Sequence, residues 1–333
     1  MTLVEVPVNR IVKARVPIAT MNAAELISRY AAGERDFSQS DLWGTNLREA
    51  NLSGINLSYS DLSGANLHGI NLQDANLSGA VLSEVDLSGA NLSGANLNKA
   101  DLEGANLRWT NLSSCSLMEA NLSRAILSKA NLSAANLTEA NLSAANLWVA
   151  DLSRAVLSRA NLKKANLNEA DLSDVNLWGA NLNGAALIGV NLQSGNLRGA
   201  YLCESRIHGN LKGANLSGAN LSQADLSDCN LDGAILSEAD MHLVNLSGAN
   251  LNGAKLRGAD MRESDLTATN LSGAVLIEAT MSMAKLNRTN LSRALLRGAD
   301  LRGTDLSSAI LDETNLNGTN LRGTIMPDKS IHN

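Results

Sequence analysis

The chain repeats itself every five residues over almost its whole length, and this period limits its shape more than any other feature. The units read approximately Ala-(Asn/Asp)-Leu-Ser-Gly, as in residues 75–79. A large apolar residue returns every five positions from Phe37 to Ile207 and again from Leu211 to Met326. A short fixed period sustained over this length predicts a solenoid, whose core grows along one axis.

A period of five matches neither the 3.6 residues of a helical turn nor the two-residue repeat of a strand. It fits a chain that makes a short extended step and then turns. In extended backbone the Leu and the Ala two positions before it point to the same side, so both can face an axis. Four such steps close a square coil of about twenty residues, and stacking at about 4.8 Å gives a rod on the order of 70 Å long.

The residue types fit these places in the coil. Gly at the last position of a unit supplies the positive φ that a type II turn requires. Where Glu84, Arg124 or Lys129 stands there instead, the sequence predicts a different turn. Asn and Asp hydrogen-bond readily to nearby backbone, which suits repeated corners.

This repeat resembles the pentapeptide-repeat family over residues 36–327. The resemblance implies an all-β solenoid, the right-handed quadrilateral β-helix, with a short N-terminal α-helical cap. Residues 21–37 are similar to the cap of cyanobacterial-type members. Asn22 is a good N-cap with Glu25 three residues later, as in a capping box. We expect a helix from Asn22 to Ala32 that covers the first coil, and Phe37, the only Phe, to plug the axis there.

The pattern divides the chain into segments. Residues 1–20 alternate apolar and polar and read as an extended arm, an edge strand, or an extension upstream of a start at Met21. The expected order is a 1–20 arm, a 21–35 capping helix, a 36–207 β-helix, a 208–210 irregular step, a 211–327 β-helix and a 328–333 tail.

Two places depart from the repeat. The step from Ile207 to Leu211 is four residues, so we expect a bulge, a kink or a change of twist, which is either a tolerated deletion or a binding feature. After Met326 the chain is too short for a capping helix, and Pro327 lacks a backbone donor. End-to-end homodimerisation through this C-terminal end is a hypothesis.

No catalytic, cofactor-binding or metal-binding pattern stands out, so we expect a protein that is not an enzyme and needs no cofactor. The four His are far apart, and Cys115, Cys203 and Cys229 lack metal-ligand spacing. Cys115 and Cys229 replace the repeat's Ala and read as inert core thiols. The net charge of −6 without a basic stripe argues against direct nucleic-acid binding. The start has no apolar run long enough for a signal peptide or a membrane span, so we expect a cytoplasmic protein.

Outward side chains twenty residues apart share a wall of the rod, and one wall gathers aromatic residues. Trp109 and Trp148, two of the four Trp, fall on it. Exposed apolar patches mark interaction sites, and Trp and Arg are common hot-spot residues. Scattered surface hydrophobics are the alternative interpretation. The candidate partner-binding residues are Arg108, Trp109, Ile126, Trp148, Val149 and Ile188.

A second candidate surface is basic. Arg257 and Arg297 share one wall, beside apolar residues at positions where Asn or Asp is usual, and Arg262, Arg302 and Arg322 share the next. Guanidinium forks could receive an acidic or phosphorylated partner. Nearby carboxylates make a mutually compensated, solvated surface the favoured interpretation. Met241, Met261 and Met281 also obey the twenty-residue spacing, at axial positions, and predict a packed internal column.

The sequence therefore predicts a non-catalytic, rod-shaped protein that docks an unidentified protein partner along one wall and binds no membrane. One alternative comes from the resemblance alone: some members are acidic rods that mimic DNA and inhibit type II topoisomerases. The mixed charge of this chain does not favour the single-sign field that mimicry needs. A purely structural spacer is the other alternative.

Overall fold

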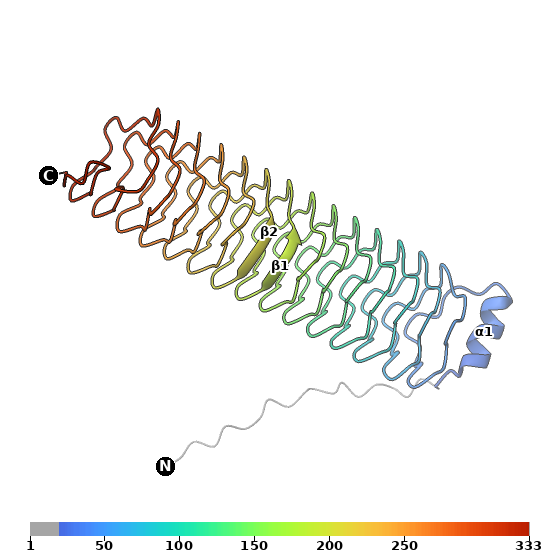
Figure 1. The fold of residues 1–333 in the computed structure, drawn as a ribbon. Helices are drawn as coiled ribbons and strands as arrows, with labels where there is room; N and C mark the ends of the chain where they lie inside the picture. Colours follow the sequence, from blue (N-terminus) through green and yellow to red (C-terminus); the bar gives the residue numbers. More distant parts are fainter. Residues whose placement is uncertain (1–19, 333) are drawn as a thin grey trace, which may run out of the picture.

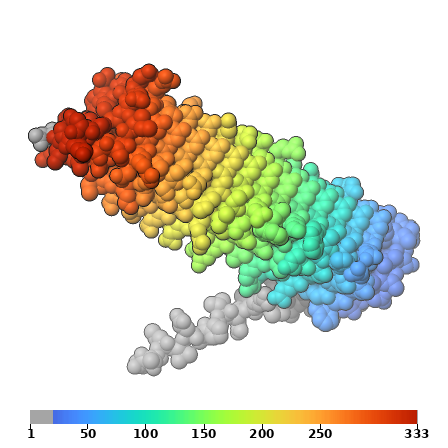
Figure 2. Space-filling view, viewed as in Figure 1, coloured from blue at the N-terminus to red at the C-terminus, as the bar shows by residue number. Residues whose placement is uncertain are grey.

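The computed structural model describes residues 20–332, and within them the chain forms one elongated rod (Figure 1). Helix α1 (Ala23–Ala31) stands at one end of the rod. Strands β1 (Ala186–Asn191) and β2 (Arg206–Asn210) lie near the middle. The remaining chain forms coils that stack along the rod axis, which give Figure 2 its regular banded surface. The expected arm over residues 1–20 lies almost wholly outside the described residues.

Successive coils pair in parallel at a spacing of twenty residues, as in Asn56 with Asn76 and Asn76 with Asn96. Each coil therefore has four walls, which we number by their first central residue. Wall 1 starts at Phe37, wall 2 at Leu42, wall 3 at Leu47 and wall 4 at Leu52.

Backbone hydrogen bonds join successive coils along the walls. One interruption lies on wall 3 between the coils centred on Leu286 and Leu306, where the Arg288 N–H donates to the Ser308 hydroxyl at 3.0 Å instead. On wall 1 the Leu57 N–H donates to the Asn76 carbonyl at 2.7 Å, and the Tyr59 N–H donates to Ser78 at 2.9 Å. The turn itself is closed by the Ser60 N–H, which donates to the Leu57 carbonyl at 3.1 Å. Because the same bonds recur in most coils, the backbone polar groups of those coils are satisfied without long strands.

The core is the column of central residues and the small residues beside them. Leu at the centre and Ala two positions earlier are buried along the rod, and Phe37 is buried at its start. Met241, Met261 and Met281 are fully buried at the centre of wall 2. Each buried side chain of this size contributes about 1.5–3 kcal/mol, so aliphatic stacking replaces the aromatic core of a globular domain.

Polar residues that replace the core Ala find an acceptor in the backbone. The Thr110 hydroxyl donates to the Leu87 carbonyl at 2.9 Å, and the Cys115 thiol donates to Leu92 at 2.7 Å. Burial raises the pKa of both Cys115 and Cys229 to about 12. These two thiols stay protonated near neutral pH, as expected of inert core cysteines.

The Asn side chains form ladders along the walls. The Asn76 amide donates to the Asn56 side-chain oxygen at 3.1 Å, and the Asn76 oxygen accepts from the Ser78 N–H at 3.2 Å. One Asn side chain thus bonds both the turn of its own unit and the Asn side chain of the preceding coil, which explains why Asn dominates this position.

The prediction of a different turn at Glu84, Arg124 and Lys129 was wrong. Their φ angles are +60°, +60° and +61°, close to those of the glycines at the same position, such as +65° at Gly79. A left-handed conformation costs an L-residue roughly 1–2 kcal/mol. The coil-to-coil hydrogen bonds on both sides of the turn hold the residue there whatever its side chain.

Helix α1 covers the first coil as predicted. The Asn22 side chain accepts from the Glu25 N–H at 2.9 Å, but the Glu25 carboxylate pairs with Arg29 at 3.3 Å instead of completing a capping box. Leu26 is fully buried against the core. The Tyr30 hydroxyl donates to the Ser53 carbonyl at 2.8 Å and fixes the helix across the coil.

The short unit produces a local shift of register between β1 and β2. Ile188 pairs with His208 and Val190 pairs with Gly209, so Gly189 has no opposite residue. From this point the coils pair at a spacing of nineteen residues until the shift has passed once around the rod. A Cβ added at Gly209 would lie 2.1 Å from the Val190 carbonyl oxygen, so only glycine fits the shortened corner.

The C-terminal end of the core is less covered than the rest. Leu311, Leu316, Leu321 and Met326 are only half-buried, whereas the Leu residues of earlier coils are fully buried. Ile325 forms an antiparallel bridge with Ile331, and the Gly323 N–H donates to the His332 carbonyl at 2.7 Å, so the chain folds back over the last corner between walls 2 and 3.

The turn geometry predicts an unusual effect of glycine at position 149. Val149 is β-branched and has a φ of +56°, so Val149→Gly should raise the free energy of unfolding by about 1 kcal/mol as the left-handed strain is released. Urea denaturation followed by circular dichroism measures this. The matched control is Val156→Gly, at a bridge position of wall 1, which should lower stability. Equal destabilisation by both changes would contradict the strain argument.

Candidate functional site

The backbone repeats from coil to coil, so the walls differ only in their outward side chains. The predicted patch lies on wall 3, and the structure brings its six residues onto that one wall. They belong to the coils centred on Leu107, Leu127, Leu147 and Leu187. We call this set the wall 3 patch: Arg108, Trp109, Ile126, Trp148, Val149 and Ile188.

Trp109 is the most exposed member of the patch, with 63% of its surface accessible. It occupies the turn position and has a φ of +56°. A large aromatic residue in a left-handed turn is held away from the core by the backbone. Arg108 precedes it and is half-buried, so a cation borders the exposed indole ring.

Trp148 is held by its neighbours and is 38% exposed. The Lys129 ammonium lies 5.2 Å from its ring centroid, and the indole N–H donates to the Glu169 carboxylate at 3.4 Å. These contacts fix the ring orientation before any partner arrives. Val149 is exposed beside it, and Ile126 is half-buried on the coil between the two Trp residues.

Ile188 lies at the far end of the patch and belongs to β1. It is 42% exposed, and its N–H donates to the Asn168 side-chain oxygen at 2.8 Å. The coil centred on Leu167 separates it from Trp148 and carries the polar residues Asn168 and Glu169. The apolar members from Trp109 to Val149 thus lie on three successive coils, with Lys129 between them at the turn position, and Ile188 is separated from them by a further coil.

The second predicted surface separates into two walls with different character. On wall 2, Arg262 and Arg302 each bind an aspartate of their own unit: Arg262 Nη2 lies 2.6 Å from Asp260 and Arg302 Nη2 lies 2.7 Å from Asp300. These arginine bonds hold the pKa of both carboxyl groups below their ordinary value. Both guanidinium groups thus bind carboxylates of their own units.

On wall 1, Arg257 pairs with Glu278 at 3.2 Å. Arg297 forms no ion pair with the described residues. Arg322, on wall 2, also forms none with them. Leu295 is 40% exposed next to Arg297. The five arginines are therefore divided between two walls, and only three of them are engaged in ion pairs with the described residues.

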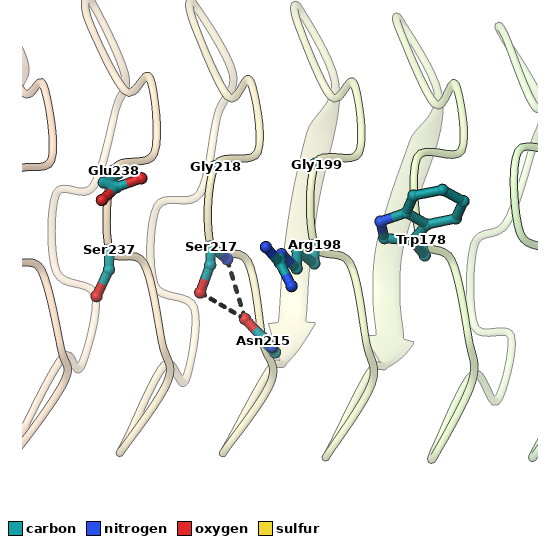
Figure 3. A pocket seen from close by; sticks show the side chains of 8 residues that line it. All are labelled: Trp178, Arg198, Gly199, Asn215, Ser217, Gly218, Ser237 and Glu238. Atoms are coloured by element: carbon teal, nitrogen blue, oxygen red, sulfur yellow. Dashed lines mark hydrogen bonds between the residues drawn. The ribbon is translucent and has the colours of Figure 1, made fainter.

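A groove on wall 1 was not predicted from the sequence. It is a hollow of about 400 Å³ between Trp178 at one end and Glu238 at the other, with Arg198 and Ser217 between them (Figure 3). Its floor includes Gly199 and Gly218, which add no side chain. Finding it from sequence required the correct register across the short unit, because Arg198 and Ser217 are nineteen residues apart.

His208 does not form a nucleophilic triad with its neighbours Asp225 and Ser227. The His208 Nε2 atom lies 3.1 Å from Asp225 Oδ2 and 3.3 Å from the Ser227 hydroxyl. In a relay, carboxylate and hydroxyl face opposite ring nitrogens, whereas here both face one nitrogen. Ser227 also donates to Asp225 at 2.8 Å. Within residues 20–332, no three His, Cys, Asp or Glu side chains are placed to hold a metal ion.

A model of the family described as pentapeptide repeats matches this chain in segments that run without a gap from residue 36 to residue 326. The chain belongs to the pentapeptide-repeat family. The fold is accordingly the right-handed quadrilateral β-helix of that family, with one short N-terminal helix. In the described part of the chain, no helix of this pentapeptide-repeat protein is long and apolar enough to cross a membrane.

Solved structures of cyanobacterial pentapeptide-repeat proteins are similar to this chain. HetL, involved in heterocyst differentiation regulation in Nostoc sp. strain PCC 7120, is 32% identical; the match covers 94% of this chain and all of HetL, with a TM-score of 0.22. Rfr23 from Cyanothece 51142 is 31% identical over 33% of this chain and 59% of its own, with a TM-score of 0.21. Comparison with curated proteins gives no match.

Proposed function

We propose that this pentapeptide-repeat protein is a non-catalytic scaffold or regulator that docks a partner protein along wall 3. The observation that carries the proposal is the placement of Trp109 and Trp148 on one wall, two coils apart, with Ile126 between them. Trp residues dominate the binding energy of many interfaces, especially where they are fixed and flanked by apolar side chains.

The rod favours this mode of binding because its side chains are already ordered. Trp148 is held by Lys129 and Glu169, and Trp109 is held outward by its turn. Side chains that are immobilised before association lose less conformational entropy on binding.

The charges beside the two indole rings indicate the chemistry of the partner. Arg108 precedes Trp109, and Lys129 occupies the turn position of the next coil. Neither cation forms an ion pair with the described residues. A partner segment with apolar side chains and flanking carboxylates is therefore complementary to the patch. The similarity to HetL makes a regulatory role in a cyanobacterial-type cell a reasonable part of the proposal.

DNA mimicry receives less support from the walls. Several carboxylates along the rod are paired with cations from neighbouring coils, as in Glu119 with Lys99 at 3.6 Å and Glu139 with Arg159 at 2.5 Å. A DNA mimic needs a continuous negative field, and interleaved ion pairs cancel such a field within a few ångströms.

We also propose that two copies associate through the C-terminal end of the rod. The half-buried Leu311, Leu316 and Leu321 form an apolar ring at that end, and their N–H groups have no acceptor among the described residues. A second copy presents the same ring and the same unpaired edge, which satisfies the requirement of a two-fold interface for self-complementary surfaces.

The wall 3 proposal predicts the effect of removing its anchors. Trp109→Ser/Trp148→Ser should weaken partner binding at least tenfold, because each anchor contributes on the order of 2 kcal/mol. The measurement is an affinity capture from source-cell lysate with quantitative mass spectrometry, followed by titration of the captured protein against purified rod.

Trp43→Ser is the matched control, since Trp43 is 68% exposed and lies on wall 2. It should leave the captured protein unchanged. Equal recovery by native protein and the wall 3 double variant would contradict the docking site, and the absence of any specific partner would favour the structural spacer.

The self-association proposal predicts a concentration-dependent dimer. Light scattering coupled to size exclusion should give twice the 35.0 kDa chain mass at high concentration. Leu316→Glu should return the protein to monomer, because it places a charge on the apolar ring without entering a covered core. A monomer at every concentration would contradict the proposal.

A further inference from the structure

The groove on wall 1 contains two charged side chains that lack partners. Arg198 and Glu238 are both exposed, and neither forms an ion pair with the described residues. They lie two coils apart, with the coil centred on Leu216 between them. Figure 3 shows the Arg198 guanidinium reaching toward that middle coil, which carries Ser217 and Gly218.

Other parts of the rod show where the missing partners would stand. Long side chains at the position after the central residue reach the turn position of the next coil. Arg257 binds Glu278 in this way at 3.2 Å, and the Trp148 indole binds Glu169 at 3.4 Å. The Glu103–Arg124 ion pair uses the same two positions with the charges exchanged.

The middle coil of the groove carries neither partner. The turn position that faces Arg198 is Gly218, where a carboxylate would stand by analogy with Glu278. The position that faces Glu238 is Ser217, where a cation would stand by analogy with Arg257. A Cβ added at Gly218 would meet nothing within 4 Å. The middle coil therefore supplies neither a carboxylate for Arg198 nor a cation for Glu238, and the space that those side chains would fill is open.

Trp178 supplies an aromatic surface at the end of the groove next to Arg198. It is 45% exposed, and the Arg159 guanidinium lies 5.7 Å from its ring centroid. Glu139 in turn holds Arg159 at 2.5 Å. The ring is therefore oriented by the rod itself and keeps part of its surface open to a ligand.

We propose that this groove binds a polyproline II segment of a partner protein that carries an acidic and a basic residue three positions apart. The acidic side chain binds Arg198 at one end of the groove, and the basic side chain binds Glu238 two coils away. A proline next to the acidic residue packs on Trp178. Aromatic-lined grooves bind such segments because the polyproline II conformation is largely formed before binding.

The spacing of the groove matches this conformation. Two coils separate Arg198 from Glu238, which is about 10 Å along the rod at the usual strand spacing. A polyproline II helix has three residues per turn and rises about 3.1 Å per residue, so side chains three apart point the same way at about 9 Å. In a β-strand the same two side chains would point to opposite sides.

The charges distinguish this ligand from polyanions. Phosphate recognition commonly uses several converging cations, whereas the groove has one unpaired cation and one carboxylate. Glu238 repels a nucleic-acid backbone at the point where a second phosphate would lie.

The test uses a fluorescein-labelled peptide, Pro-Pro-Glu-Pro-Pro-Lys-Pro-Pro, titrated with the full-length protein and followed by fluorescence polarisation. We expect saturable binding that Arg198→Ser and Glu238→Gln each weaken by roughly tenfold, the usual effect of losing a charge-assisted hydrogen bond. A peptide with one additional Pro between Glu and Lys should bind as weakly as those variants, because its charges no longer face the same side.

Arg257→Ser is the control on the same wall, since it removes an arginine that already has a partner; it should leave binding unchanged. The wall 3 double variant should also bind normally, which separates this site from the proposed docking patch. Equal binding of the two peptides, or an equal loss with Arg257→Ser, would overturn the proposal. No measurable binding, or displacement of the peptide by an oligonucleotide, would overturn it as well.

Discussion

The hydrogen bonds from each coil to the next hold this structure together, and the rest of the molecule follows from them. The central residue and the turn residue of most units donate to the next coil, so the backbone must return to the same place every twenty residues. This repetition leaves room for one large side chain at each axial position and for a small one beside it. Leu and Ala meet those two requirements at low cost in conformational entropy.

The same hydrogen bonds allow residues other than glycine to adopt a positive φ at the turn position. Thirty-four non-glycine residues have positive φ in the described chain, and their local strain is spread over many coils. The protein can therefore place Trp109, Glu169 or Glu278 at turns, where they project from the wall. Side chains of different chemistry can therefore occupy the turns, because the coil-to-coil hydrogen bonds offset the backbone strain.

Much of the architecture could be predicted from the period alone. The four walls, the buried Met column, the N-cap at Asn22 and the plugged first coil depend on spacing and residue size, which a single sequence contains. The turn at Glu84 was mispredicted because local preference was weighed without the coil-to-coil bonds that override it. Within the wall 3 patch, the shared wall was predictable. The contacts of Trp148 with Lys129 and Glu169 were not, because they depend on side-chain conformation.

The groove on wall 1 was missed for a different physical reason. Arg198 and Glu238 matter because the middle coil lacks the ion-pair partners that other coils supply. This difference can be recognised only once the ion-pair geometry of the rod is known. The four-residue step at Gly209 also moves the register by one. A strict count of twenty therefore aligns Arg198 with the turn residue Gly218, whereas its true neighbour is Ser217.

Hydrogen–deuterium exchange resolved to single amides tests the central claim, that a uniform ladder of coils holds the rod. We predict slow exchange at the N–H groups of central residues from Leu42 to Leu306 other than Leu286, with no loss at the short unit. Exchange should be fast at Leu316 and Leu321, which lack a following coil. Slow exchange confined to β1 and β2, with fast exchange in the coils on either side, would contradict the account.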